Sequence, residues 1–151
     1  MCWHRQNYGL SDKIVTSPLD NLTGHSGSLA IEPPDLDEFA GLKHSGLTRL
    51  KDAQIAGLSL EGQFDLIYNA SHALCLAALR WRGYRAKHRY IVFQVLPHTL
   101  NLGPDVWRVL SKGHDIRNLR EYEGDLNVDE RIVSDLLTAC KAVAKAIEGL
   151  E

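Results

Sequence analysis

The segment from Leu60 to Leu79 has the strongest helical periodicity in the sequence, and it limits what the rest of the chain can build. Ser59 before it suits a helix N-cap, and Gly83 after it suits a helix end. Between these two residues, side chains that can share one packed face recur at i, i+3 and i+4 spacing: Leu60, Phe64, Ile67, Tyr68, Ser71, Leu74, Cys75, Ala78 and Leu79. The sequence therefore predicts one long helix in the middle of the chain.

Another helix is predicted just after the Pro33-Pro34 pair, because two prolines disfavour helical backbone before them. Asp35 suits its N-cap, and Glu38 three residues later suits the capping-box partner. Apolar residues at helical spacing extend this predicted helix as far as Gly57.

The second half of the chain predicts two more helices and one ambiguous segment. Pro104 suits the first turn of a helix, and Asn127 followed by Glu130 suits the start of a last helix with a broad apolar stripe. Residues 90–96 are rich in β-branched side chains, which favour a strand. Since no other segment offers a comparable strand to pair with, we expect a helix there that stops near Pro97.

These segments together predict an all-α protein, with a bundle of four to five helices over residues 32–151. A mostly irregular N-terminal arm over residues 1–31 is expected to pack on this body. The length of 151 residues and the apolar fraction of 44% fit one hydrophobic core. No uncharged apolar run is long enough for a membrane span, and the formal net charge of −2 excludes a uniformly basic nucleic-acid coat.

The cysteines and histidines bear on location and cofactors. Three cysteines, Cys2, Cys75 and Cys140, stand far apart and form no C-x-x-C pair, which favours a reduced cytoplasmic protein. Cys75 and Cys140 lie among alanine and leucine residues, so we expect them to be buried. No metal-ligand spacing or phosphate-binding glycine loop is recognisable, so neither a metal nor a cofactor is predicted.

Five basic residues lie within residues 80–89 with no acidic residue among them. They are Arg80, Arg82, Arg85, Lys87 and Arg89, and Trp81, Tyr84, His88 and Tyr90 stand between or beside them. Guanidinium groups pair with phosphates and aromatic faces stack on bases, so this segment predicts a contact with single-stranded RNA. The alternative is a solvated helix end, where cations complement the helix dipole.

A second polar cluster lies on the helix predicted after Pro104. His114, Arg117 and Glu121 stand at i, i+3 and i+7, so they share one face. There His114 could move a proton, Arg117 could hold a phosphate and Glu121 could orient either, which is the minimum for a metal-independent phosphodiesterase. The alternative is a set of plain surface ion pairs.

Three stretches carry a resemblance to a known family. The first stretch is residues 64–79, in which an aromatic residue is followed by alanine-rich turns and then by Gly83-Tyr84-Arg85 after the helix. The second is His88 before residues 90–93. The third is Arg117-Asn118 followed by Tyr122 and Glu123. With these features residues 35–150 resemble the HEPN superfamily of α-helical bundles, which includes toxin–antitoxin and defence ribonucleases. The resemblance implies a homodimer, RNA as a ligand, and a cognate antitoxin or nucleotidyltransferase-like protein as a partner.

The chain departs from this family at the catalytic position. In active HEPN ribonucleases a histidine follows the motif arginine by several residues, whereas here Tyr122, Glu123 and Gly124 occupy those positions and no histidine follows His114. We therefore expect a non-catalytic protein that binds RNA or a partner. The residues expected to make these contacts are Arg82, Arg85, Lys87, Arg89, Arg117, Asn118 and Arg120.

Two alternatives stay open at this point. One is an active metal-independent ribonuclease, with its catalytic residues among His114, Arg117, Glu121 and Tyr122. The other is a dimerising scaffold that binds no nucleic acid.

Overall fold

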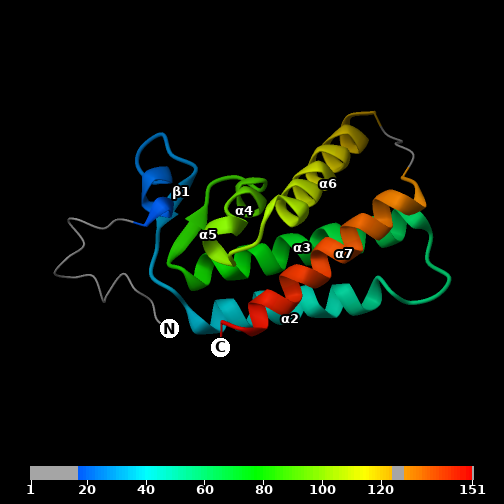
Figure 1. Ribbon diagram of the computed structural model, residues 1–151, viewed down its shortest axis with the longest axis horizontal. Coiled ribbons are helices and arrows are strands. Elements are labelled where there is room, and N and C mark those ends of the chain that lie inside the picture. The colour runs from blue at the N-terminus through cyan, green and yellow to red at the C-terminus, as the bar shows by residue number, and fades with distance from the viewer. Residues whose placement is uncertain (1–16, 124–127, 151) are drawn as a thin grey trace.

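The protein is a helical bundle with one very short sheet, as the computed structural model shows (Figure 1). The structure describes residues 17–123 and 128–150, with the backbone alone at residues 121–123. Its elements are η1 (Pro18–Leu22), β1 (Leu29–Ile31), α2 (Leu36–Asp52), α3 (Leu60–Trp81), β2 (Tyr84–Ala86), α4 (Ile91–Gln94), α5 (Leu96–Thr99), α6 (Pro104–Glu123) and α7 (Glu130–Glu148). The predicted all-α fold class is confirmed.

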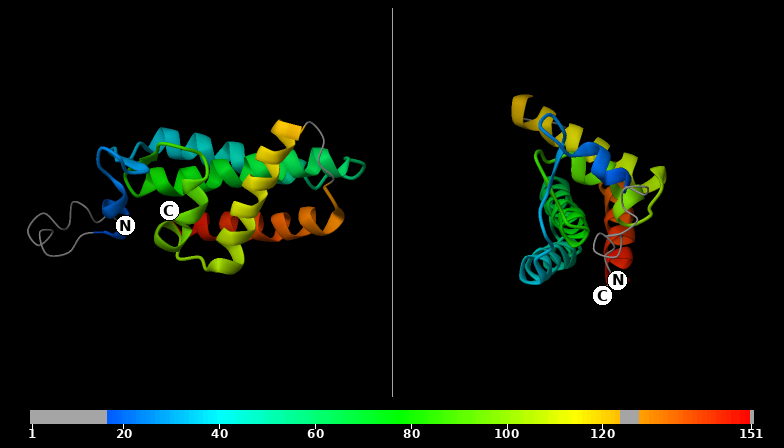
Figure 2. Two further views of the ribbon diagram at one scale, coloured as in Figure 1. Left: turned by 90° about the horizontal axis from the view of Figure 1, so that it is seen from above. Right: turned by 90° about the vertical axis from the view of Figure 1, so that its left-hand side faces the viewer.

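Helix α3 is the axis of the bundle, and the other elements pack around it. Helix α2 runs alongside it, α7 packs against both α3 and α6, and α6 crosses over α3 obliquely (Figures 1 and 2). Most side chains of α3 are buried, as expected for a helix with packing partners on several sides. Within the described residues, none of the helices is long and apolar enough to cross a membrane.

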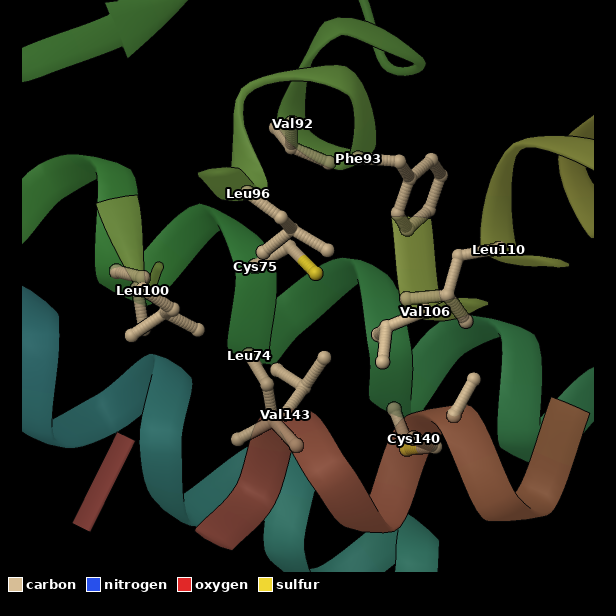
Figure 3. Close-up of a cluster of buried hydrophobic side chains, with 14 of the residues drawn as sticks. Leu74, Cys75, Val92, Phe93, Leu96, Leu100, Val106, Leu110, Cys140 and Val143 are labelled. Atoms are coloured by element: carbon tan, nitrogen blue, oxygen red, sulfur yellow. The ribbon is translucent and has the colours of Figure 1, made fainter. Parts of the chain in front are cut away.

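The core lies where α3, α4, α6 and α7 meet (Figure 3). Leu74 and Cys75 from α3 meet Phe93 from α4 and Val143 from α7 there, and each of them is fully buried. The predicted burial of Cys75 and Cys140 is confirmed; it raises the pKa of the Cys75 thiol and raises that of Cys140 to about 11. Both thiols are therefore inert packing groups at neutral pH.

The helix starts follow the predicted capping chemistry in part. The carboxylate of Asp35 accepts from the backbone N–H groups of Asp37 and Glu38, so the predicted N-cap is confirmed. Ser59 caps α3 as predicted. Glu38, however, does not act as a plain capping-box partner, because its carboxylate accepts hydrogen bonds from two arginines far along the chain.

Two predicted helix boundaries were wrong. Helix α2 ends at Asp52 rather than Gly57. The last helix is capped by Asp129, whose carboxylate accepts from the backbone N–H of Ile132, and not by Asn127, which lies outside the described residues. An aspartate two positions later offers the same cap, so the type of cap was predicted but its residue was not.

The N-terminal arm carries more structure than expected. Residues 1–16 lie outside the described residues, and the rest of the arm contains η1 and β1, joined by an irregular turn. Leu19 and Leu29 of this segment are buried in the core.

The expectation that only residues 90–96 could compete as a strand was also wrong. Strand β1 pairs antiparallel with β2, with Leu29 opposite Ala86 and Ile31 opposite Tyr84. The chain leaves α3 through Gly83, whose φ of 90° lies in the left-handed region that glycine adopts without strain. That turn places residues 84–86 in extended form beside the arm.

Residues 90–96 are helical, as predicted, but not as one helix. Helix α4 ends at Gln94, and α5 begins at Leu96, so Pro97 lies in the first turn of α5 and does not stop the segment. Proline fits a first turn because the N–H that it lacks has no helical partner there.

Candidate nucleic-acid interface

Tyr68 of α3 is the centre of a polar cluster beneath α6. Its hydroxyl oxygen lies 2.9 Å from Nδ1 of His114, and Nε2 of His114 lies 3.0 Å from the Asn118 amide nitrogen. The guanidinium carbons of Arg117 and Arg89 lie 5.2 and 5.6 Å from the centroid of the Tyr68 ring, within cation–π range. We call these five residues, Tyr68, Arg89, His114, Arg117 and Asn118, the Tyr68 cluster.

Helical spacing explains which residues of α6 join the cluster. His114, Arg117 and Asn118 stand at i, i+3 and i+4, so they share the face that α6 presents to α3. The end of this helix is held on α3 by an ion pair of 2.8 Å between Arg120 and Asp65.

A glycine sets how closely α6 lies on α7. A Cβ built on Gly113 would lie 2.7 Å from a methyl carbon of Leu136, so a side chain there would require the Leu136 side chain or the helix to shift. Helix α6 therefore packs closely on α7 at Gly113, the residue before His114. This contact helps to set the distance between His114 and α3.

The hydrogen bonds occupy both ring nitrogens of His114. With the Asn118 amide nitrogen as donor, Nε2 accepts and Nδ1–H donates to the Tyr68 hydroxyl oxygen. That oxygen is also 3.5 Å from Nε of Arg89, a second donor. The phenol O–H of Tyr68 is then left to donate to another acceptor.

The electrostatics of the cluster keep its imidazoles neutral. Burial, with the guanidinium groups of Arg117 and Arg89, holds the pKa of His114 below its ordinary value against the opposing carboxylate of Asp115. His72 lies one turn after Tyr68, edge-on against Phe93, and burial with the same arginines lowers its pKa to about 4. The site is therefore cationic because of its arginines, with imidazoles that resist protonation.

The basic run of residues 80–89 does not form one cationic surface. Arg80 is 1% exposed, and its guanidinium donates to the Glu38 carboxylate at 2.7 Å and to the backbone carbonyls of Glu32, Pro33 and Tyr84. Arg85 donates to the carboxylates of Glu32 and Glu38, and these hydrogen bonds raise the pKa of Arg85 and lower that of Glu32. The pKa of Glu38 is lowered by its hydrogen bonds from Arg80 and from Arg85. The acidic partners of this basic run are thus Glu38, at the start of α2, and Glu32, before that helix.

Other predicted contact residues also bind within the chain. Arg82 donates twice to the Thr99 carbonyl, at 3.1 and 2.9 Å, and Lys87 donates to the Gly24 carbonyl at 2.9 Å. Arg120 is held by Asp65. Of the predicted RNA contacts, the structure thus gathers Arg89, Arg117 and Asn118 at one place and engages Arg82, Arg85, Lys87 and Arg120 elsewhere.

The predicted catalytic set is only partly described. His114 and Arg117 both face Tyr68, as their shared helix face predicts. The side chains of Glu121 and Tyr122 lie outside the described residues. Among the described residues, no group of three histidine, cysteine, aspartate or glutamate side chains is placed to hold a metal ion.

Tyr68 was not among the residues predicted to contact RNA or to act in catalysis. Its position in the apolar rhythm of α3 makes it look like a core residue, and at 2% exposure it is one by area. The available signal was its spacing: His72 follows it at i+4, and a hydroxyl and an imidazole on one face of a buried helix need polar partners. Which helix supplies those partners depends on tertiary packing.

Comparisons with protein-family models, with curated proteins and with solved structures find no match to this chain.

Proposed function

We propose that this protein is a HEPN-like helical bundle that binds single-stranded RNA at the Tyr68 cluster without cleaving it. The observation that carries the proposal is the convergence of Arg89 and Arg117 on the ring of Tyr68. Arginine pairs with phosphate through several N–H donors, and the exposed Arg89 can reach a ligand without leaving the cluster. Arg117 comes from α6 and Arg89 from the segment before α4, so a phosphate between them would contact two separate elements.

The arrangement of His114 supports binding rather than catalysis. A general acid or base needs a ring nitrogen within hydrogen-bond reach of the substrate. Both nitrogens of His114 already have partners, Tyr68 and Asn118. Its imidazole is therefore suited to position the Tyr68 hydroxyl. This chain has Tyr122 where the family motif has its catalytic histidine, and this agrees with a role in binding.

The test is a titration of fluorescently labelled single-stranded RNA with the purified protein in EDTA. We expect binding that Arg117→Ala weakens severalfold, since one arginine–phosphate contact is lost. Arg49→Ala is the matched control, because Arg49 is an exposed arginine on α2, away from the Tyr68 cluster, and it should leave the affinity unchanged. Equal affinity of the Arg117→Ala and Arg49→Ala variants would contradict the proposal.

The same samples, run on a denaturing gel, test the rival enzyme. The proposal expects intact RNA. Cleavage that survives EDTA and is lost in both His114→Ala and Arg117→Ala would instead establish a metal-independent ribonuclease. If no RNA binds, the surface serves a protein partner such as the antitoxin or nucleotidyltransferase-like protein that the resemblance implies, or a scaffold.

We propose that the protein is a homodimer, as the HEPN resemblance implies, and that it lies in the cytoplasm, as the cysteine pattern favours. Light scattering on the purified chain checks the dimer, with an expected mass of twice 16.9 kDa. A mass of one chain at micromolar concentration would contradict it.

A further inference from the structure

Residues 88–90, between β2 and α4, send their side chains to two different places. His88 and Tyr90 place their rings in line with His114: the His88 and Tyr90 centroids lie 4.9 Å apart with the planes 25° from parallel, and those of Tyr90 and His114 lie 5.8 Å apart at 28°. Arg89, between them, points to Tyr68 instead. We call His88, Tyr90 and His114 the ring column.

The inner end of the ring column is held in place. His114 is fixed by its hydrogen bonds to Tyr68 and Asn118. Tyr90 directly precedes Ile91, Val92 and Phe93, which are all buried and anchor the backbone of this segment in the core. The ring column is thus preorganised, so ligand binding would cost little side-chain entropy for ordering these rings.

The outer end of the column is open to solvent. His88 is exposed, and Tyr90, one of the few large aromatic side chains on this surface, is 39% exposed. A single exposed tyrosine is common on protein surfaces and indicates no function by itself. Tyr90, however, stacks between two imidazoles and lies beside two arginines, and this combination points to a ligand. The centroid distances lie in the range of offset stacking, and a nucleobase stacks on such rings at the same spacing.

We propose that the ring column is a base-stacking subsite, so that one nucleotide binds with its base on the exposed ring of His88, at the outer end of the column, and its phosphate between Arg89 and Arg117. This inference rests on the proposed RNA-binding function and extends it to the bases. Stacking uses the π-face that every base has, so the subsite tolerates any base and favours purines for their larger area.

The test compares two single-stranded oligomers with the same number of phosphates: an oligoadenylate and an abasic oligomer. Titrations of the full chain at one ionic strength should give at least about fivefold tighter binding of the oligoadenylate. Tyr90→Ala, which removes the ring on which His88 stacks, should abolish this preference, whereas Tyr90→Phe, which keeps the ring, should retain it. Arg117→Ala should weaken the binding of both oligomers alike.

Two results would overturn the inference while leaving the proposed function intact: equal affinity of the wild-type chain for both oligomers, or a Tyr90→Ala variant that loses affinity for both equally. Failure of the wild-type chain to bind either oligomer would overturn the proposed function and this subsite with it. Far-UV circular dichroism of each variant confirms that the helices are retained.

Discussion

Tyr68 and His114, separated by 46 positions in the sequence, share a hydrogen bond of 2.9 Å. This contact brings the polar face of α6 onto the central helix of the bundle. It also places Arg117, from α6, and Arg89, from the segment before α4, over one aromatic ring. The candidate site thus forms because α6 crosses α3 at this point. Variants that alter helix packing therefore test the fold on which the site depends.

Two glycines of α2 should respond in opposite ways to alanine. A Cβ on Gly46 would lie 2.6 Å from Cγ of Leu74 and 3.1 Å from the Ala70 carbonyl oxygen, so Gly46→Ala must separate α2 from α3. We expect it to reduce the free energy of unfolding by about 1–3 kcal/mol. Gly41→Ala meets no atom within 4 Å and should raise it by about 0.5–1 kcal/mol, because alanine favours helix.

Urea unfolding of both variants measures these changes. A Gly46→Ala variant as stable as the Gly41→Ala variant would mean that α2 and α3 do not lie this close.

Arg80 should be essential for stability rather than for ligand binding. It is 1% exposed and joins the end of α3 to the Glu38 carboxylate and to the Glu32 and Pro33 carbonyls. Arg80→Met keeps the apolar stem but leaves the Glu32 and Pro33 carbonyls without this donor and Glu38 with Arg85 as its remaining partner, and we expect a loss of about 1–3 kcal/mol in the free energy of unfolding.

Arg49→Met, at an exposed position of α2, is the control and should change the stability by less than about 0.5 kcal/mol. Chemical denaturation compares the two variants. Similar midpoints for both would show that the Arg80 network adds little to the fold.

The stability of the protein should fall between pH 6.5 and 4 because of His72. Its pKa is about 4 in the folded protein and 6.5 ordinarily, so in this window the unfolded chain binds more protons than the folded one. The contribution is full above pH 6.5 and is lost as the pH falls toward 4, by at most about 3 kcal/mol. The lowered pKa of His114 acts in the same direction.

His72→Gln cannot take up the proton, so its stability should depend less on pH across this window than that of the wild-type chain. His98→Gln, at an exposed position, is the matched control. Thermal or urea unfolding at several pH values measures the slopes, and identical slopes for wild type and His72→Gln would refute the assignment.

A second pH effect should appear at lower pH. The hydrogen bonds of Arg80 and Arg85 hold the pKa of Glu38 below 4.5, so the stability from this carboxylate is present above pH 4.5 and is lost as the pH falls through the folded-state pKa. Glu38→Gln should lose stability at neutral pH and show a smaller further loss on acidification. A Glu38→Gln variant with the acid sensitivity of the wild-type chain would contradict this.

The sequence predicted what local chemistry determines. Periodicity and caps located α3 and the start of α2, because Ser59 and Asp35 act on the backbone within three residues of themselves. The face of α6 with His114 and Arg117 was likewise visible, since helical geometry alone places them together.

What the sequence did not predict depends on distant partners. The run of residues 80–89 contains no acid, yet Arg80 and Arg85 meet Glu32 and Glu38, which lie more than forty positions earlier. Strand β2 forms only because the arm supplies β1 beside it. Tyr68 looked like a core residue until α6 placed His114 on it.

The central claim is that RNA binds at the Tyr68 cluster and is not cleaved. The most direct test is the anisotropy of labelled single-stranded RNA in EDTA over a range of salt concentrations, with wild type and an Arg89→Ala, Arg117→Ala double variant. We predict a stable plateau for the wild-type complex, and a slope of log affinity against log salt that is shallower in the double variant by about 1.4, for two lost phosphate contacts. Equal slopes, or an anisotropy that falls with time below that of the free RNA, would contradict the account.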